Sequence, residues 1–272
     1  MAGFFGFFDY TKEGPGIDKN APKKKTFIVF FETFFRNMWK LISVNAVYII
    51  MALLIIPIGL ANVGLTNVTR NLARDKHSFM LSDFFETIKK NWKQGLTVGI
   101  INTVVFAFMA FALRFYSKAD GKIGVFGLGV SIMGFLVFTV MNFYIYTLMI
   151  TFNFTLKQLY VNSFKFVFLN LKNNVFCLFS LFLIFAVNYT VLASLTAVQF
   201  QVLFIELFIA ILTLPGFVFL IVQYATFPGI KKFIIDPYYK QHPGEDIEKR
   251  RNLGLEIHEE TTDGEYNEIE DV

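Results

Sequence analysis

Residues 36–74 read RNMWKLISVNAVYIIMALLIIPIGLANVGLTNVTRNLAR, and positions 41–65 within them carry no charged side chain. About 20 apolar residues are enough for a helix to span the roughly 30 Å hydrocarbon core of a bilayer. Pro57 and Gly59 lie near the centre of this stretch, and a proline removes a backbone donor and clashes with the preceding helical turn. The stretch therefore predicts either one kinked crossing or two short crossings joined at Pro57.

The composition of the whole chain also indicates a membrane protein. The chain has 272 residues, of which 55% are hydrophobic, and it contains 36 phenylalanines. Its mean hydropathy is +0.53. A bilayer explains this excess, because lipid-facing as well as buried positions must then be apolar. The single cysteine, Cys177, excludes an intramolecular disulfide.

The charges are divided unevenly along the chain. Residues 1–244 hold 22 Lys/Arg and 10 Asp/Glu, a net charge of +12, whereas residues 245–272 have a net charge of −8. A basic membrane body is typical of cytoplasmic loops that face anionic lipid. Nucleic acid is not an expected partner, because the basic residues are scattered between hydrophobic spans.

Four further spans and three amphipathic pieces follow from the hydrophobic pattern. The spans are expected at residues 95–115, 124–152, 175–198 and 202–227. The amphipathic pieces are expected from residue 26 into the first span, at 75–92 and at 157–172, where aromatic residues recur at helical spacing beside basic ones.

The distribution of Lys and Arg favours six crossings over five. The segment up to Lys40 holds 7 of them, the 70–93 loop 6, the 157–172 loop 3 and the C-terminal region 6. With five spans the first two of these segments would lie on opposite faces of the membrane. Two crossings, 36–56 and 57–74, would put every large basic segment in the cytoplasm. The second of them is too polar to face lipid, so it would have to be buried through small residues such as Gly59 and Gly64.

We therefore expect an all-α, polytopic membrane helix bundle of five to six crossings, with six favoured, a proline-centred helical hairpin at Pro57 and interfacial amphipathic helices. Residues 1–25 would form a cytoplasmic N-terminal extension, residues 26–233 the transmembrane helical domain, and residues 234–272 a cytoplasmic, largely disordered acidic tail.

Three stretches resemble the YesL-like family, a family of unknown function in Gram-positive bacteria. They are GPGIDKNAPKKKTFIVFFETFFRNMWKLI (14–42), IIPIGLANVGLTNVTRNLARDKHSF (55–79) and SDFFETIKKNWKQG (82–95). Members of that family are often encoded beside carbohydrate ABC importers, so the resemblance implies an accessory role in sugar uptake. No catalytic residues are established for the family, and none can be carried over to this chain.

The 70–93 loop is the expected contact site for an importer permease or ATPase, because it combines aromatic with basic side chains. Its candidate contact residues are Arg70, Arg74, Phe84, Phe85, Lys89, Lys90 and Trp92. The alternative interpretation is that these aromatic residues only hold the amphipathic helix at the membrane interface.

Glu206 is the only acidic residue within any expected span, and Arg114 lies at the end of another. Six crossings would put both near the outer boundary of the membrane, which predicts an intramembrane ion pair or a carboxylate at the level of the headgroups, rather than a proton relay. Four span amides, Asn45, Asn102, Asn142 and Asn188, are expected to bond across helices, although a substrate path along them stays an alternative.

No catalytic, metal or cofactor site is expected. The three histidines are far apart in the sequence, whereas a metal site needs clustered ligands. We therefore expect a non-enzymatic integral membrane accessory subunit of a carbohydrate ABC importer, in the lipid bilayer of the bacterial cell membrane, with both termini cytoplasmic. The alternative is a stand-alone transporter or channel for a small solute, and a membrane enzyme comes third.

Overall fold

The computed structural model is helical apart from one short strand pair, which confirms the expected fold class. It describes residues 25–55, 57–76, 79–196, 200–242, 258–260 and 266–268. Most of the expected extension and of the expected acidic tail therefore lies outside the described residues. The elements are α1 (Thr26–Leu53), α2 (Ile58–Ala73), α3 (Met80–Tyr116), α4 (Gly121–Thr151), α5 (Leu156–Leu169), α6 (Leu171–Thr196), α7 (Phe200–Ile230), the π-helix η1 (Lys231–Ile235), α8 (Asp236–Gln241), β1 (His258–Glu260) and β2 (Tyr266–Glu268). Strands β1 and β2 pair in antiparallel fashion.

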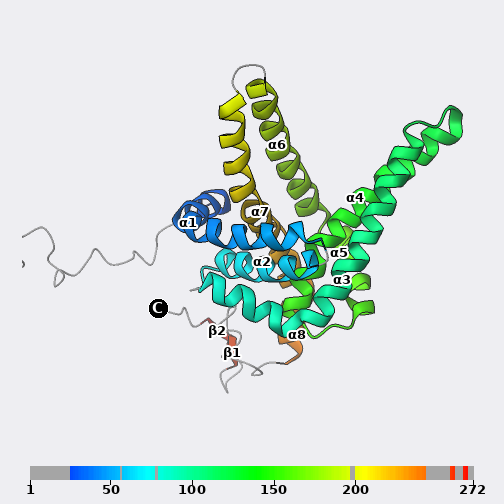
Figure 1. The fold of residues 1–272 in the computed structure, drawn as a ribbon. Helices are drawn as coiled ribbons and strands as arrows, with labels where there is room; N and C mark the ends of the chain where they lie inside the picture. Colours follow the sequence, from blue (N-terminus) through cyan, green and yellow to red (C-terminus); the bar gives the residue numbers. More distant parts are fainter. Residues whose placement is uncertain are drawn as a thin grey trace, which may run out of the picture.

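The helical hairpin expected at Pro57 is present. Helix α1 ends at Leu53, and Ile55 turns the chain with a left-handed backbone (φ of 60°). Pro57 then directly precedes the first residue of α2, where its missing N–H needs no partner because the first N–H groups of a helix have none within it. The two helices are thus antiparallel neighbours that pack against each other (Figure 1).

Helix α2 is the centre of the fold. Of its 16 residues, 10 are buried, and it packs against α1, α3, α4 and α7. This agrees with the expectation that a helix of this polarity has to be covered by protein. The 16 residues measure only about 24 Å at the rise of an α-helix, which is short for a bilayer crossing.

Glycines allow α2 and α3 to touch through their backbones. A Cβ atom on Gly59 would lie 2.3 Å from the Gly95 carbonyl oxygen and 2.5 Å from the Gly99 Cα atom. Further along α2, the ring of Phe84 lies against Gly64, whose added Cβ would be 2.6 Å from the ring. Small residues of this kind let helices approach closely in membranes.

Four helices are long and apolar enough to cross a membrane: α3, α4, residues 171–193 of α6, and residues 204–241, which comprise most of α7 with η1 and α8. They correspond to the four spans expected after residue 94, with differences of a few residues at the ends, so the chain is a multi-pass membrane protein. The expected five to six crossings are not confirmed, because neither α1 nor α2 is among these helices. Arg36, Lys40 and Asn45 lower the hydropathy of α1, and α2 is short and buried.

The long helices form two hairpins that leave a common layer. In Figure 1, α1, α2 and the first part of α3 run across the molecule, whereas the α6–α7 pair and the outer parts of α3 and α4 extend away from them and diverge. Large apolar side chains are exposed on both hairpins, for example Phe108 (71%), Phe126 (74%) and Phe182 (69%). Such a surface is expected to face lipid.

Helix α7 belongs to both of the larger hydrophobic cores. Its Leu220 packs with α1, α2 and α3 around Leu41, Leu65 and Phe84. Its Ile230 belongs to a second cluster, which α4 and α5 complete around Tyr144. Helix α7 therefore packs both against the central layer, at Leu220, and against α4 and α5, at Ile230. The π-helix η1 continues α7 directly.

We predict that Gly59→Ala lowers the stability of the protein, because its methyl group would meet the backbone of α3, which has no rotamer with which to avoid it. A loss of about 1–3 kcal/mol is typical of such overpacking. The measurement is thermal unfolding of the full chain in detergent. Gly129→Ala in α4 is the matched control, since nothing lies within 4 Å of the added Cβ, and it should be neutral or slightly stabilising. Equal melting temperatures for the two variants would contradict the crossing.

Candidate functional site

Arg70 joins α2 to the end of α4. One of its guanidinium nitrogens (Nη1) donates to the Ile150 carbonyl and to the Thr151 hydroxyl, both at 3.0 Å, and the other (Nη2) donates to the Asn67 side chain at 2.7 Å. The last carbonyls of a helix lack intrahelical partners and carry a partial negative charge. Arg70 therefore caps α4, which is a structural task.

Arg74 has no comparable task. Its guanidinium lies 4.3 Å from the ring centroid of Phe227, and its buried Nε atom makes no hydrogen bond within the described part of the chain. Burial lowers the pKa of Arg70 to about 10. Burial, and then the charge of Arg70, lower the pKa of Arg74 to about 9. Both side chains therefore remain protonated at neutral pH, and the charge of Arg70 disfavours that of Arg74.

A basic pocket lies beside these arginines, between α1 and the connection from α2 to α3. Its volume is about 230 Å³, and its lining is Arg36, Asn37, Lys40, Leu72, Asp75, Lys76 and Met80. Asp75, the only acid in this lining, forms a salt bridge with Arg36. Burial, followed by the charges of Arg74 and Arg70, lowers the pKa of Lys76. The pocket thus has an excess of positive charge.

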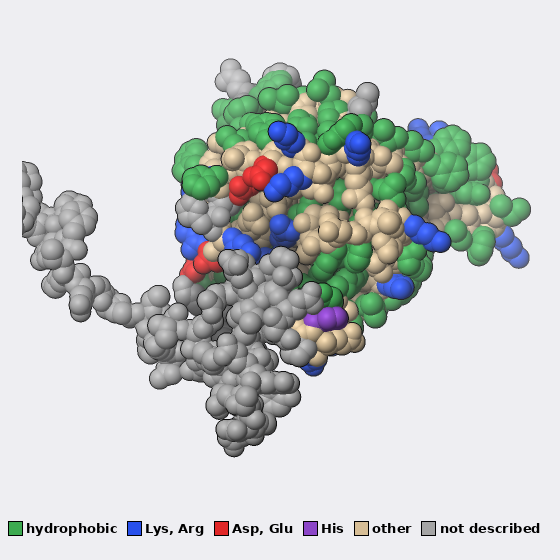
Figure 2. Space-filling model, turned by 90° about the horizontal axis from the view of Figure 1, so that it is seen from below, with side chains coloured by type: hydrophobic (Ala, Val, Ile, Leu, Met, Phe, Trp, Pro, Cys, Tyr) green, Lys and Arg blue, Asp and Glu red, His purple; other side chains and the backbone are tan. Residues whose placement is uncertain are grey.

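The first part of α3 carries an exposed stripe that consists of Leu81, Phe85, Lys89 and Trp92, at helical spacing. Phe85 is 52% and Trp92 51% exposed. Lys90, next to the stripe, pairs with Glu86 at 2.7 Å. Seen from below, the molecule shows Lys and Arg side chains scattered beside hydrophobic ones (Figure 2).

The structure divides the expected contact residues into two groups. Phe85, Lys89, Lys90 and Trp92 are exposed on α3, where a partner could reach them. Phe84 is fully buried against Gly64, so it offers no surface, and Arg70 and Arg74 are enclosed between helices. Adjacent residues on a helix point in different directions, which explains why Phe84 and Phe85 differ.

The ion pair expected between Arg114 and Glu206 is not formed. Arg114 is exposed in the last turn of α3, and the salt bridges of the described residues do not include it. Glu206 lies near the beginning of α7. These two helix ends belong to different hairpins, which diverge in Figure 1.

Three of the four span amides bond across helices, as expected. Asn102 of α3 donates to Asn142 of α4 at 2.6 Å and accepts from the Tyr160 hydroxyl of α5 at 2.8 Å. Asn45 of α1 donates to the Leu212 carbonyl of α7 at 2.7 Å. Neither of the two cavities described for this chain is lined by Asn45, Asn102 or Asn142.

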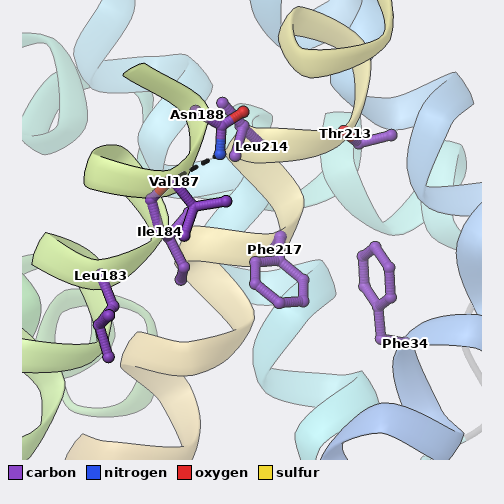
Figure 3. A pocket seen from close by; sticks show the side chains of 8 residues that line it. All are labelled: Phe34, Leu183, Ile184, Val187, Asn188, Thr213, Leu214 and Phe217. Carbon is purple, nitrogen blue, oxygen red and sulfur yellow. Dashed lines mark hydrogen bonds between the residues drawn. The ribbon is translucent and has the colours of Figure 1, made fainter. Parts of the chain in front are cut away.

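A second, apolar cavity of about 400 Å³ lies between α1, α6 and α7 (Figure 3). Its lining is Phe34, Leu183, Ile184, Val187, Asn188, Thr213, Leu214 and Phe217. The two polar side chains in this lining bond to their own helices, Asn188 to the Ile184 carbonyl at 2.8 Å and Thr213 to the Ile209 carbonyl at 2.8 Å. The cavity therefore offers surface for an apolar group but no chemistry.

The described residues contain no group of three His, Cys, Asp or Glu side chains that could hold a metal ion. A family profile described as "Protein of unknown function, DUF624" matches residues 41–113, which comprise the second half of α1, all of α2 and most of α3. No curated protein and no solved structure matches the chain.

The basic pocket is the site that sequence reasoning missed. Arg36 and Lys40 precede the turn at Pro57 by about as many residues as Asp75 and Lys76 follow it. A hairpin at Pro57 therefore brings the two charged ends of the stretch together. The sequence therefore contains a signal for this pocket, in addition to what the same charges indicate about the cytoplasmic side.

We predict that Arg70→Gln destabilises the protein more than Arg74→Gln does. Hydrogen bonds to a charged group contribute about 1.5–3 kcal/mol to stability, and Arg70→Gln removes those that cap α4. Arg74→Gln removes only a contact with a ring and relieves the repulsion between the two arginines. Thermal unfolding of both variants in detergent is the measurement. A larger loss in Arg74→Gln would show that Arg74 holds the fold.

Proposed function

We propose that this protein is a non-enzymatic membrane subunit whose α3 stripe binds a partner protein. The observation that carries the proposal is the half exposure of Phe85 and Trp92 beside Lys89 on a helix that is fixed to the core. Large aromatic side chains dominate the energetics of protein interfaces. The Gly59 contact and the buried Phe84 hold this part of α3 in place, so little ordering would be needed on binding.

We further propose that the partner is the permease or the ATPase of a carbohydrate ABC importer. This step rests on the resemblance to the YesL-like family, which includes residues 82–95 and therefore Phe85, Lys89 and Trp92 of the stripe. The profile match over residues 41–113 supports that resemblance, because it covers the same hairpin and the same part of α3.

The stripe should face the cytoplasm of a bacterial cell. With crossings at α3, α4, α6 and α7, the N-terminal segment, the 70–93 region, the connection through α5 and the C-terminal region all lie on one side. These are the segments rich in Lys and Arg, which favours the cytoplasm for both termini. Six crossings would place them on the same side. With four, the α1–α2 hairpin would lie in the cytoplasmic interface, with its exposed tip of Leu53, Leu54 and Ile55 towards lipid.

The hydrogen bonds of the span amides favour this proposal over a stand-alone transporter or channel. Such a protein needs polar side chains that converge on a path for the solute. Asn102 and Asn142 bond to each other instead, and Asn45 bonds to the backbone of α7.

The sidedness is tested by cysteine labelling in intact cells. Lys118→Cys should react with an impermeant thiol reagent from outside, whereas Ser82→Cys and Lys157→Cys should react only after the membrane is opened. The native Cys177 is buried, so the unsubstituted protein serves as the silent control. Labelling of position 82 from outside would place the stripe on the wrong side for a cytoplasmic ATPase.

The partner is tested by purifying the full-length protein from its native membrane. We expect permease and ATPase subunits to co-elute at a fixed stoichiometry. Phe85→Ala and Trp92→Ala should each weaken the association by about tenfold or more, since a central aromatic residue typically contributes at least about 2 kcal/mol to binding. The matched controls are Phe111→Ala and Phe126→Ala on the lipid-facing hairpin, which should leave it unchanged. Equal recovery with the stripe variants, or solute uptake by the protein alone in liposomes, would contradict the proposal.

A further inference from the structure

We propose that the basic pocket binds a phosphate group, carried by an anionic phospholipid headgroup or by a soluble phosphate ester. Arg36 and Lys40 reach it from α1, and Lys76 reaches it from the connection between α2 and α3. A pocket of about 230 Å³ has room for such a group. This inference is independent of the α3 stripe and of its partner.

The charges around the pocket are not balanced by the protein. The lining has three cations and one acid, Asp75, which pairs with Arg36. Arg70 and Arg74 add two buried positive charges close enough to lower the pKa of Lys76. Arg70 is used by the end of α4, but Arg74 and both lysines have no acidic partner among the salt bridges of the described residues. A bound anion would relieve this repulsion.

The geometry of the pocket suits a phosphate group. The guanidinium of Arg36 can offer two parallel donors, and a lysine ammonium adds a point charge. The Lys76 backbone is fixed by a hydrogen bond of 3.0 Å to the Asn71 carbonyl. Asp75 forms a salt bridge with Arg36. The backbone of Asp75 is left-handed, with φ of 49°, which is uncommon for a residue other than glycine. A phosphate group would compete with this carboxylate for Arg36.

The position on α1 makes a lipid headgroup a natural source of the phosphate. Trp39, which directly precedes Lys40, is 77% exposed, and Phe35 is also exposed. Exposed tryptophan beside lysine is typical of the headgroup level of a membrane. A phospholipid could therefore place its phosphate in the pocket while its acyl chains stay in the bilayer.

The test uses the full-length protein, stripped of lipid in detergent, with phosphatidylglycerol as the anionic probe, phosphatidylcholine as the zwitterionic probe and inorganic phosphate as the soluble one. We expect phosphatidylglycerol to bind and to raise the melting temperature, and phosphatidylcholine to do neither. The double variant Lys40→Gln/Lys76→Gln should weaken phosphatidylglycerol binding by about tenfold or more, because each lysine provides a charged hydrogen bond. Lys118→Gln/Lys122→Gln at the tip of the α3–α4 hairpin is the control and should bind like the natural sequence.

Binding of inorganic phosphate with the same dependence on Lys40 and Lys76 would assign the pocket to a soluble phosphate ester. Binding of phosphatidylglycerol alone would assign it to a lipid. Equal losses in the test and control variants, or no loss in either, would overturn the proposal. Asp75→Asn keeps the proposal testable if the double variant does not fold: it should bind phosphatidylglycerol more tightly, because it frees Arg36, and unchanged or weaker binding would count against the site.

Discussion

The backbone contact between α2 and α3 is the constraint on which the rest of this structure depends. Helices in lipid are not driven together by the hydrophobic effect, so their association depends on close packing between small residues. Gly59 gives α2 that approach to Gly95 and Gly99. Because α2 is too polar to face lipid, α1, α4 and α7 must cover its other sides. A second contact, between Phe84 and Gly64, holds the first part of α3 against α2 and buries that side chain.

The asparagines complete this packing with hydrogen bonds between helices. Pro215 lies inside α7 and cannot donate a backbone hydrogen bond. Its missing N–H leaves the Ile211 carbonyl without an intrahelical donor, and Asn45 of α1 donates at 2.7 Å to the neighbouring Leu212 carbonyl. Gly216 leaves room for the amide, since a Cβ there would be 2.9 Å from the Asn45 oxygen. Polar side chains in membrane bundles commonly bond across helices, so Asn45 has a structural use whether or not a solute passes.

The local features of this fold could be predicted from the sequence, whereas the relative placement of its parts could not. Pro57 and the polarity of residues 57–74 correctly predicted a break and a buried helix. The number of crossings could not follow from the charges, because four and six crossings put the same basic segments on the same side. The pair of Arg114 with Glu206 failed because similar depth in a membrane says nothing about which hairpins are neighbours. For the stripe, the pattern predicted Phe85 and Trp92 as contact residues and both are exposed, but only the contact with Gly64 shows that Phe84 is covered.

The end of α2 explains why so much positive charge is tolerated with so little acid. The C-termini of α2 and α4 meet there, and each carries a partial negative charge from its unpaired carbonyls. Arg70 binds the carbonyl of Ile150, so the backbone of α4 takes the place of an acidic side chain. Arg70 alone is enough to bind the end of α4. Arg74 and Lys76 bond to no acid in the described chain, and they raise the electrostatic energy of the folded state. Charges that the fold does not need, beside a pocket, are those that a bound anion would use.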